Sequence, residues 1–226
     1  MKTIIILSLL ILTTHYSLLN STLWEIKQDG TGDFTTISEG IEAAQNGDRL
    51  LVYPCIYYEN INFNGKNIEI TSLYTPENGN RSYIRETVID GNHNGTVVTF
   101  DSGESRDTVL SGFTIRNGAY WEFEHQGWGG GIHIGSGSSP VIRYCVVEHN
   151  LSYGGAGGIQ SSSASPLLIG NTVRHNHGRR NGGITISGPI PLNYAELCSE
   201  ELNSIYHNYG SDSCDLRINT TNQTTI

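Results

Sequence analysis

The sequence has no apolar run long enough to cross a membrane. The run Ile4–Leu12, near the start of the chain, is nine residues long, is interrupted only by Ser8 and follows Lys2. A helical membrane span needs ~20 residues, whereas a basic start followed by a brief apolar run is typical of a secretory signal peptide. We therefore expect residues 1–19 to be a signal peptide, and the mature protein to be secreted or displayed at the cell surface without a membrane span.

Basic residues are also scarce. The chain has 13 Lys and Arg against 22 Asp and Glu, which gives a formal net charge of −9 at pH 7. Nucleic acid and anionic membrane surfaces attract proteins with a basic excess. The charge balance therefore argues against both as the main partner.

Cysteines are few, and they fit an oxidising compartment. The chain has four of them: Cys55, Cys145, Cys198 and Cys214. Four cysteines allow three pairings, and the sequence does not choose among them. Cys198 and Cys214 are the favoured pair because they lie in a polar tail, where a local crosslink would help most. Cys145 lies inside a repeat, where we expect a small buried side chain rather than a reactive thiol.

The middle of the chain repeats itself. Gly-Gly-Ile occurs at 130–132, 157–159 and 182–184, and Pro140 and Asn150 recur 26 residues later as Pro166 and Asn176. A repeat of this length cannot bury its apolar face alone, so it must stack on copies of itself. The sequence therefore predicts a solenoid.

Apolar residues within the repeats alternate with polar ones. Ile132 and Ile134 correspond to Ile159 and Ser161 in the next repeat. Alternation with a period of two indicates strands rather than helices, and the Gly and Ser clusters between the strands supply tight corners. Leucine-rich repeats are the nearest alternative, but their LxxLxL pattern is missing. We predict an all-β protein, a right-handed parallel β-helix whose coils span 49–188, followed by an irregular segment, 189–226, or a truncated continuation of the solenoid.

A short helix is expected before the coils. Thr36 and Glu39 have the spacing of a capping box, and Asn46-Gly47 marks a stop. Residues 20–48 are therefore predicted to form an amino-terminal cap, with a helix around Thr36–Gln45 that covers the open end of the solenoid.

The segment DGTGDFTTISEGIEAAQNGDRLLVYPCIYYENI resembles the start of pectin methylesterases and related secreted β-helix proteins. The resemblance covers roughly residues 28–71 and includes the pattern Y-x-E-x-I around Glu59. It implies the pectin-lyase-like fold. The GQDTL-like, FIFG-like and RPW-like segments that carry catalysis in that family are missing, as are the NTD, DD, GHG and RIK motifs of polygalacturonases. The resemblance therefore implies the fold without the activity.

Stacked coils predict which residues are neighbours, because equivalent positions lie ~4.8 Å apart. Three such ladders are expected: Arg116, Glu148 and Arg174; Asn117, His149 and His175; and Gly118, Asn150 and Asn176. The first is interpreted as a surface row of ion pairs, in preference to a catalytic arginine. The histidines are interpreted as surface residues, because no third metal ligand is visible at matching spacing. The asparagines are expected to be structural.

One flank of the solenoid carries the candidate binding site. The segments 119–129, 151–156 and 177–181 should leave the same edge of the coils. Aromatic rings stack on sugars, and arginines pair with carboxylates. The residues proposed to bind a ligand are Trp121, Trp128, Tyr153, His177, Arg179 and Arg180. The alternative is that these aromatic residues fold back and seal the coils.

The favoured function is that of a secreted, monomeric β-helix protein that binds a polysaccharide or a surface partner, without a metal or other cofactor. The candidate partners are an acidic polysaccharide and a cell-surface glycan. One alternative is a divergent polysaccharide lyase or hydrolase, for which Glu122 and Glu124 are the carboxylates that the loop offers, with Ca²⁺ if it is a lyase. Another is a structural stalk or adhesin segment.

Overall fold

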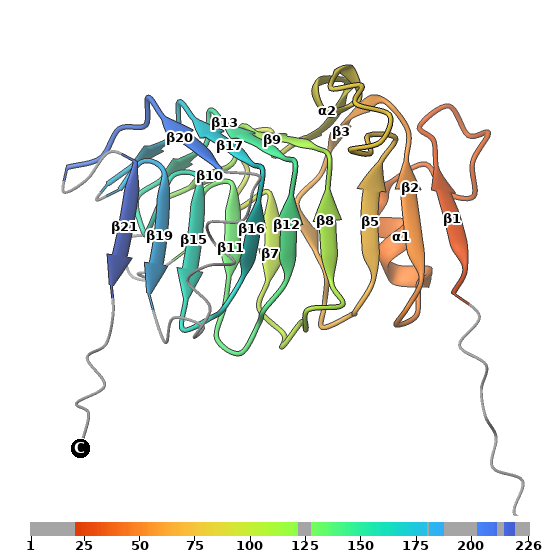
Figure 1. Ribbon diagram of the computed structural model, residues 1–226, viewed down its shortest axis with the longest axis horizontal. Helices are drawn as coiled ribbons and strands as arrows, with labels where there is room; N and C mark the ends of the chain where they lie inside the picture. Colours follow the sequence, from red (N-terminus) through yellow and green to blue (C-terminus); the bar gives the residue numbers. More distant parts are fainter. Residues whose placement is uncertain (1–20, 122–127, 180, 188–202, 212–214, 220–226) are drawn as a thin grey trace, which may run out of the picture.

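The computed structural model describes residues 21–121, 128–179, 181–187, 203–211 and 215–219. In these residues the chain forms a right-handed parallel β-helix, with three six-stranded sheets, a further three-stranded sheet and two short helices (Figure 1). All strand pairings within the four sheets are parallel, as stacked coils require. The predicted fold class is confirmed.

Each coil contributes one strand to each of the main sheets, which we call A, B and C. Sheet A has the order β1 (Leu23–Ile26), β2 (Arg49–Val52), β5 (Glu69–Ser72), β8 (Val109–Ser111), β12 (Val141–Arg143), β16 (Leu167–Ile169). Sheet B runs β3 (Cys55–Tyr58), β6 (Thr87–Asp90), β9 (Thr114–Arg116), β13 (Val146–Glu148), β17 (Thr172–Arg174), β20 (Ser204–Tyr206). Sheet C runs β4 (Ile61–Asn62), β7 (Val98–Phe100), β11 (Ile132–Ile134), β15 (Ile159–Ser162), β19 (Ile184–Ser187), β21 (Leu216–Asn219).

A small sheet, D, joins sheets B and C on one flank. It consists of β10 (Ala119–Tyr120), β14 (Leu151–Ser152) and β18 (His177–Gly178). Past Gly188, where the sequence repeat fades, β20 pairs with β17 and β21 pairs with β19. Strand β1 pairs with β2, so the segment before the helix also contributes to sheet A.

The register agrees with the repeat read from the sequence. Ile132 pairs with Ile159, and Ile159 pairs with Ile184. The side chains of all three are buried in the core that runs along the solenoid. In the earlier coils larger rings fill the same interior, where Phe63 stacks on Phe100 with the ring centroids 4.4 Å apart.

The helix α1 (Ile37–Ala43) lies at the amino-terminal end, behind β2 in Figure 1. Its N-cap is Thr36, and both hydrogen bonds of the predicted capping box with Glu39 are present. Gly40 allows the helix to approach the first coils closely, because a Cβ atom there would lie 2.7 Å from Cδ1 of Ile26. The other helix, α2 (Ser82–Glu86), packs beside β6.

The Y-x-E-x-I pattern ties this cap to the coils. The carboxylate of Glu59 accepts the backbone N–H groups of Ile37 and Ser38 at 2.9 Å each, at the positive end of the α1 dipole. The hydroxyl of buried Tyr57 donates to the carbonyl oxygens of Ile26 and Tyr53. Tyr57 and Glu59, which belong to the pattern that resembles pectin methylesterases, therefore have structural roles in joining the cap to the coils.

Asparagines form a hydrogen-bonded ladder at one corner of the coils, as predicted. Oδ1 of Asn150 accepts the backbone N–H of Gly118 at 2.8 Å, and Nδ2 of Asn150 donates to Oδ1 of Asn176 at 2.9 Å. Asn208 adds a further rung. A second ladder, at the corner between sheets A and B, runs through Cys145, Asn171 and Asn203.

Candidate functional site

Sheet D brings the three flank segments to one edge. Ala119 pairs with Leu151, and Leu151 pairs with His177, so the segments leave the coils one above the other. This confirms the shared edge predicted from the repeats. The segment 119–129 is not a loop from its first residue, however, because β10 forms part of it: backbone pairing along the flank extends beyond the corner.

One row of side chains follows directly from this edge. The backbone N–H of Tyr153 donates to the carbonyl of Tyr120 at 2.9 Å, and the backbone N–H of Arg179 donates to the carbonyl of Ser152 at 2.8 Å. These bonds place Trp121, Tyr153 and Arg179 at equivalent positions of successive coils. We call them the flank row.

The rings of the flank row are stacked. The centroids of Trp121 and Tyr153 lie 5.4 Å apart with the ring planes 27° from parallel. Trp121 remains 54 % exposed, while Tyr153 is partly buried. Arg179 and His177 are exposed beside them. Arg180, Glu122 and Glu124 lie outside the described residues.

Trp128 has a different environment. Its ring lies parallel to that of His133 on the outer face of sheet C, with the centroids 4.3 Å apart, and stacks on Tyr120 at 5.7 Å. The hydroxyl of Ser152 donates a hydrogen bond to the carbonyl oxygen of Trp128 at 2.8 Å, which fixes the backbone of Trp128 against β14. Trp128 therefore covers the coils, while Trp121 projects from them into solvent.

The charged ladder on sheet B contains ion pairs, as predicted for Glu148 and Arg174, while Arg116 pairs with Asp90, which the predicted ladder did not include. Nε of Arg116 lies 2.8 Å from Oδ2 of Asp90, and Nη2 of Arg174 lies 2.8 Å from Oε2 of Glu148. Hydrogen bonds with Tyr206 and Glu148 raise the pKa of Arg174. The guanidinium is held in its charged form, so it cannot serve as the proton-accepting base of a lyase.

Three histidines form a stack beside that ladder. His149, His175 and His207 follow one another with successive ring centroids 5.4 Å apart, and all three have a positive φ of 54° to 55°. Within the part of the chain that the structure describes, no group of three or more His, Cys, Asp or Glu side chains is arranged to hold a metal ion.

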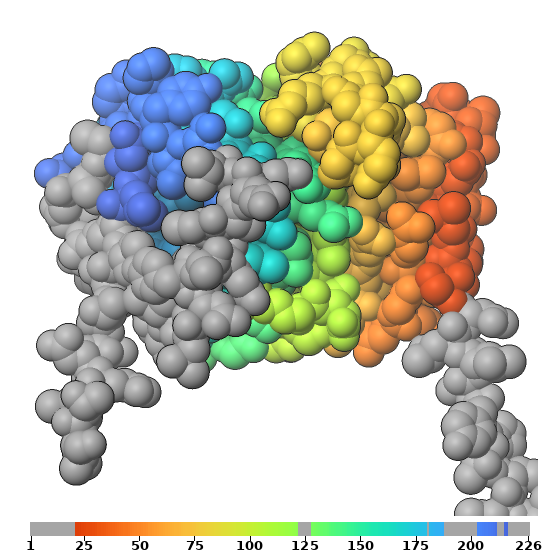
Figure 2. Space-filling view, in the orientation of Figure 1, coloured from red at the N-terminus to blue at the C-terminus, as the bar shows by residue number. Residues whose placement is uncertain are grey.

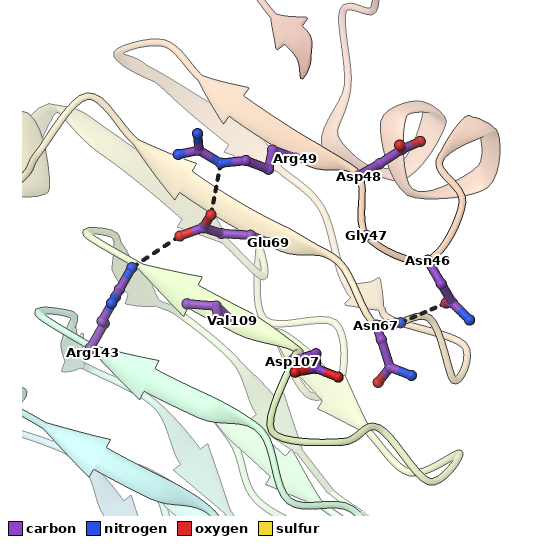
Figure 3. Close-up of a pocket in the computed structure, with 9 residues that line it drawn as sticks. All are labelled: Asn46, Gly47, Asp48, Arg49, Asn67, Glu69, Asp107, Val109 and Arg143. Atoms are coloured by element: carbon purple, nitrogen blue, oxygen red, sulfur yellow. Dashed lines mark hydrogen bonds and ion pairs between the residues drawn. The ribbon is translucent and has the colours of Figure 1, made fainter. Parts of the chain in front are cut away.

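A second candidate region lies on the outer face of sheet A and was not predicted. Nε of Arg49 lies 2.7 Å from Oε2 of Glu69, and Nη2 of Arg143 lies 3.0 Å from Oε1 of the same carboxylate. This bridge, Arg49–Glu69–Arg143, lines two hollows of about 580 and 400 Å³, and Figure 3 shows the first of them. Arg143 lies 74 residues from Glu69 in the sequence, and only the stacking of the coils reveals that they meet.

The two cysteines in the described residues carry free thiols. Cys145 is 1 % exposed, which agrees with the small buried side chain predicted for it. Burial raises the pKa of its thiol to about 11. The proposed Cys198–Cys214 pair lies outside the described residues.

No protein-family model and no curated protein matches the chain. Among solved structures it is similar to the pectin methylesterase from carrot, with a TM-score of 0.44 and 14 % identity over 86 % of this chain and 70 % of that one. It is also similar to a pectin methylesterase mutant in complex with a hexasaccharide, with a TM-score of 0.39 and 10 % identity over 91 % of this chain and 67 % of that one. The parallel pairing of its strands makes the chain a β-helix repeat protein. No described helix is both long and apolar enough to span a bilayer.

Proposed function

We propose that the protein is secreted and binds an acidic polysaccharide through the flank row. The observation that carries the proposal is the exposed ring of Trp121, 54 % accessible although one side of it is stacked on Tyr153. A large aromatic surface left in solvent on an otherwise ordered edge is a characteristic of binding sites. Secretion is inferred from the basic and apolar start of the chain.

The preference for an acidic sugar rests on the position of Arg179. It occupies the coil position next to Tyr153, so a polymer lying along the row would meet two aromatic rings and then a guanidinium. Arginine pairs with carboxylates through a planar fork of N–H donors. Exposed His177 lies on the same edge. Trp128 supports the site from below, because its ring packs on Tyr120, the residue before Trp121.

The test compares the affinities for polygalacturonate, alginate and a neutral glucan by calorimetry, for the wild type, Trp121→Ala and Arg179→Ala. We expect the wild type to bind the acidic polymers. Trp121→Ala should weaken that binding by about 1 kcal/mol, the typical contribution of one aromatic platform. Arg179→Ala should weaken it by an amount that shrinks as salt is added.

Tyr58→Ala is the matched control, because Tyr58 is 64 % exposed on sheet B, away from the flank. Its affinity for acidic polymers should equal that of the wild type. If the wild type binds no acidic polymer, or if the control loses as much affinity as Trp121→Ala, then the flank row is only a cover for the coils and the stalk interpretation is preferred.

A further inference from the structure

The outer face of sheet A has the features of a second binding site, on a different side of the coils from sheet D. The first hollow is lined by residues around the turn from α1 to β2 and by Asn67 and Asp107. The second is lined by strands β2, β5 and β8 and by the segment after β5, including Tyr74 and Glu77. In Figure 2 the segment between β5 and β6, coloured yellow, stands out from the surface beside sheet A. The Arg49–Glu69–Arg143 bridge separates the two hollows and lines both of them.

The bridge is held in place from several directions. Glu69 holds a guanidinium on each of its carboxylate oxygens. Nε of Arg143 also donates to the hydroxyl of Ser111 at 3.3 Å, which fixes the side chain across β8. A guanidinium has five N–H donors, and Figure 3 shows the terminal nitrogens of Arg49 turned away from Glu69. The bridge therefore presents oriented donors at the border of the two hollows.

The polar end of the first hollow is equally fixed. Oδ1 of Asn46 accepts the backbone N–H of Asn67 at 2.9 Å. Oδ1 of Asn67 in turn accepts the backbone N–H of Ser105 at 2.8 Å and the hydroxyl of Thr108 at 2.9 Å. Since these bonds involve the amide oxygens, the orientation of each carboxamide is set and its nitrogen can donate elsewhere. A ligand would meet groups that are already ordered, which lowers the entropy lost on binding.

The second hollow adds an aromatic wall. Tyr74 packs edge-on against Tyr144, with the ring centroids 5.5 Å apart and the planes at 63°. The two residues line the hollow together with Thr71 and Ser111. Tyr74, Thr71 and Ser111 are buried, so the partly buried ring of Tyr144 is the aromatic surface that a ligand can reach. Rings next to oriented polar groups suit a ligand that has both C–H faces and hydroxyls.

The charges of the two hollows decide which class of ligand fits. Four acidic residues, Asp48, Glu69, Glu77 and Asp107, line them against two guanidinium groups, Arg49 and Arg143. The carboxylate of Asp48 accepts from the N–H groups of Thr22, Trp24 and Gln45, so the other three carboxylates are the ones that a ligand meets. Burial raises the pKa of Asp48, but hydrogen bonds from Gln45 and Thr22 outweigh it and leave that pKa below its usual value. Hydrogen bonds from its own backbone N–H and from Thr75 lower the pKa of Glu77. Both side chains are thus held ionised, and the excess of negative charge repels an anion.

We propose that the two hollows on sheet A bind a neutral oligosaccharide, whose hydroxyls bond to the Arg49–Glu69–Arg143 bridge and to the amides of the first hollow while a sugar face packs on Tyr144. This site selects against the acidic sugars proposed for the flank row. It requires no metal ion and no chemical change in the ligand.

The experiment uses the full chain carrying Trp121→Ala and Arg179→Ala, which removes the exposed ring and the guanidinium of the flank row. It titrates this chain with the neutral probes cellohexaose and mannohexaose and with the acidic probe hexagalacturonate. We expect at least one neutral probe to bind more tightly than the acidic one. Arg143→Lys, which removes the planar fork, should weaken neutral binding by about tenfold, the equivalent of one hydrogen bond to a charged group. Arg116→Lys alters an equivalent ion pair on sheet B and should leave the affinity unchanged.

Glu69→Gln gives a second, independent outcome. The substitution keeps the shape of the side chain but releases two guanidinium groups, so it should weaken neutral binding and strengthen the binding of hexagalacturonate. Circular dichroism and the unfolding midpoint show whether each variant is folded. The proposal is overturned if neither neutral probe binds at millimolar concentration, if Arg143→Lys and Arg116→Lys behave alike, or if the acidic probe is preferred before Glu69 is changed. None of these results bears on the flank row, because its Trp121 and Arg179 are replaced in every arm.

Discussion

Nζ of Lys66 lies 2.6 Å from the carbonyl oxygen of Ile41 and donates a hydrogen bond to it at the carboxyl-terminal end of α1. The same ammonium donates to the carbonyls of Glu42 and Ala44 at 2.7 and 2.8 Å. Carbonyls at the end of a helix have no partner within the helix, and the end carries partial negative charge. With Glu59 at the other end, the first coils hold both ends of the cap helix through opposite charges.

Replacing Lys66 with methionine should therefore loosen the cap. The variant keeps much of the aliphatic side chain but leaves the carbonyls of α1 without their charged donor, so the free energy of unfolding should fall by on the order of 2 kcal/mol. Urea denaturation followed by circular dichroism measures this. Lys27→Met is the control, because Lys27 pairs with Glu25 at the surface, and its midpoint should stay close to that of the wild type. Equal effects of the two substitutions would show that Lys66 is not part of the cap.

The asparagine ladder should contribute more than any surface pair. Oδ1 of Asn176 accepts hydrogen bonds from the backbone N–H and from Nδ2 of Asn150. Nδ2 of Asn176 donates to the carbonyl oxygen of Val147 at 2.9 Å and to Oδ1 of Asn208 at 3.0 Å. Asn176 is fully buried. Asn176→Ala leaves several buried polar groups unpaired, each of which costs about 1 to 3 kcal/mol, so we expect a loss of about 3 kcal/mol or more.

The measurement is again the free energy of unfolding, with Asn94→Ala as the matched substitution. Asn94 is exposed in a turn between β6 and β7, and its change should alter stability by less than about 0.5 kcal/mol. Asn176→Asp separates shape from hydrogen bonding, because the carboxylate keeps the acceptors and loses the donors. A ladder variant as stable as Asn94→Ala would contradict the structural role given to the corner.

Much of the fold could be predicted because it repeats. The same environment recurs in successive coils at Ile132, Ile159 and Ile184, so the repeated sequence pattern identified the core. The recurrence of Asn150 and Asn176 identified the corner in the same way. The capping box of Thr36 and Glu39 was predictable because it is local. Each of these features depends on residues whose spacing in the chain is fixed by a single coil or a single turn.

The sites were harder to predict because they combine residues that do not repeat. Arg143 crosses β8 to reach Glu69, and nothing in the spacing of 74 residues marks that contact. Trp121 and Trp128 are close in sequence, yet one is exposed and the other lies on His133. Which tryptophan packs depends on the bond from Ser152 to the Trp128 carbonyl, a tertiary contact that composition does not encode. Burial could be inferred from the period inside the coils, whereas the exposure of the two tryptophans in the flank segment could not.

Because the thiol of Cys145 is buried, we expect the free energy of unfolding to fall at alkaline pH. Burial raises its pKa to about 11, against an ordinary value of 9.0. Above pH 9 the unfolded chain releases this proton while the folded protein retains it, so the unfolded state gains stability and the free energy of unfolding falls. The stabilising effect is fully present below pH 9 and is lost as the pH rises towards 11, by at most about 1.4 kcal/mol per pH unit. Burial of Tyr57 raises the pKa of its phenol as well, so it adds to the loss above pH 10.

Cys145→Ala removes the thiol contribution and leaves that of Tyr57. Urea denaturation at pH 7.5 and at pH 10.5 should therefore show a smaller drop in the variant than in the wild type, although the variant is less stable at pH 7.5 because it leaves a small cavity. Asn94→Ala serves as the control, since the exposed Asn94 has no titratable group, and its drop should match that of the wild type. Cys55, by contrast with Cys145, is only partly buried at the start of β3. Burial should make Cys145 react with iodoacetamide only through unfolding, at a rate that rises with urea, while Cys55 reacts in the native protein. If Cys145→Ala and the wild type lose the same free energy between the two pH values, the buried thiol does not titrate in this range, and the alkaline loss belongs to Tyr57 and other groups.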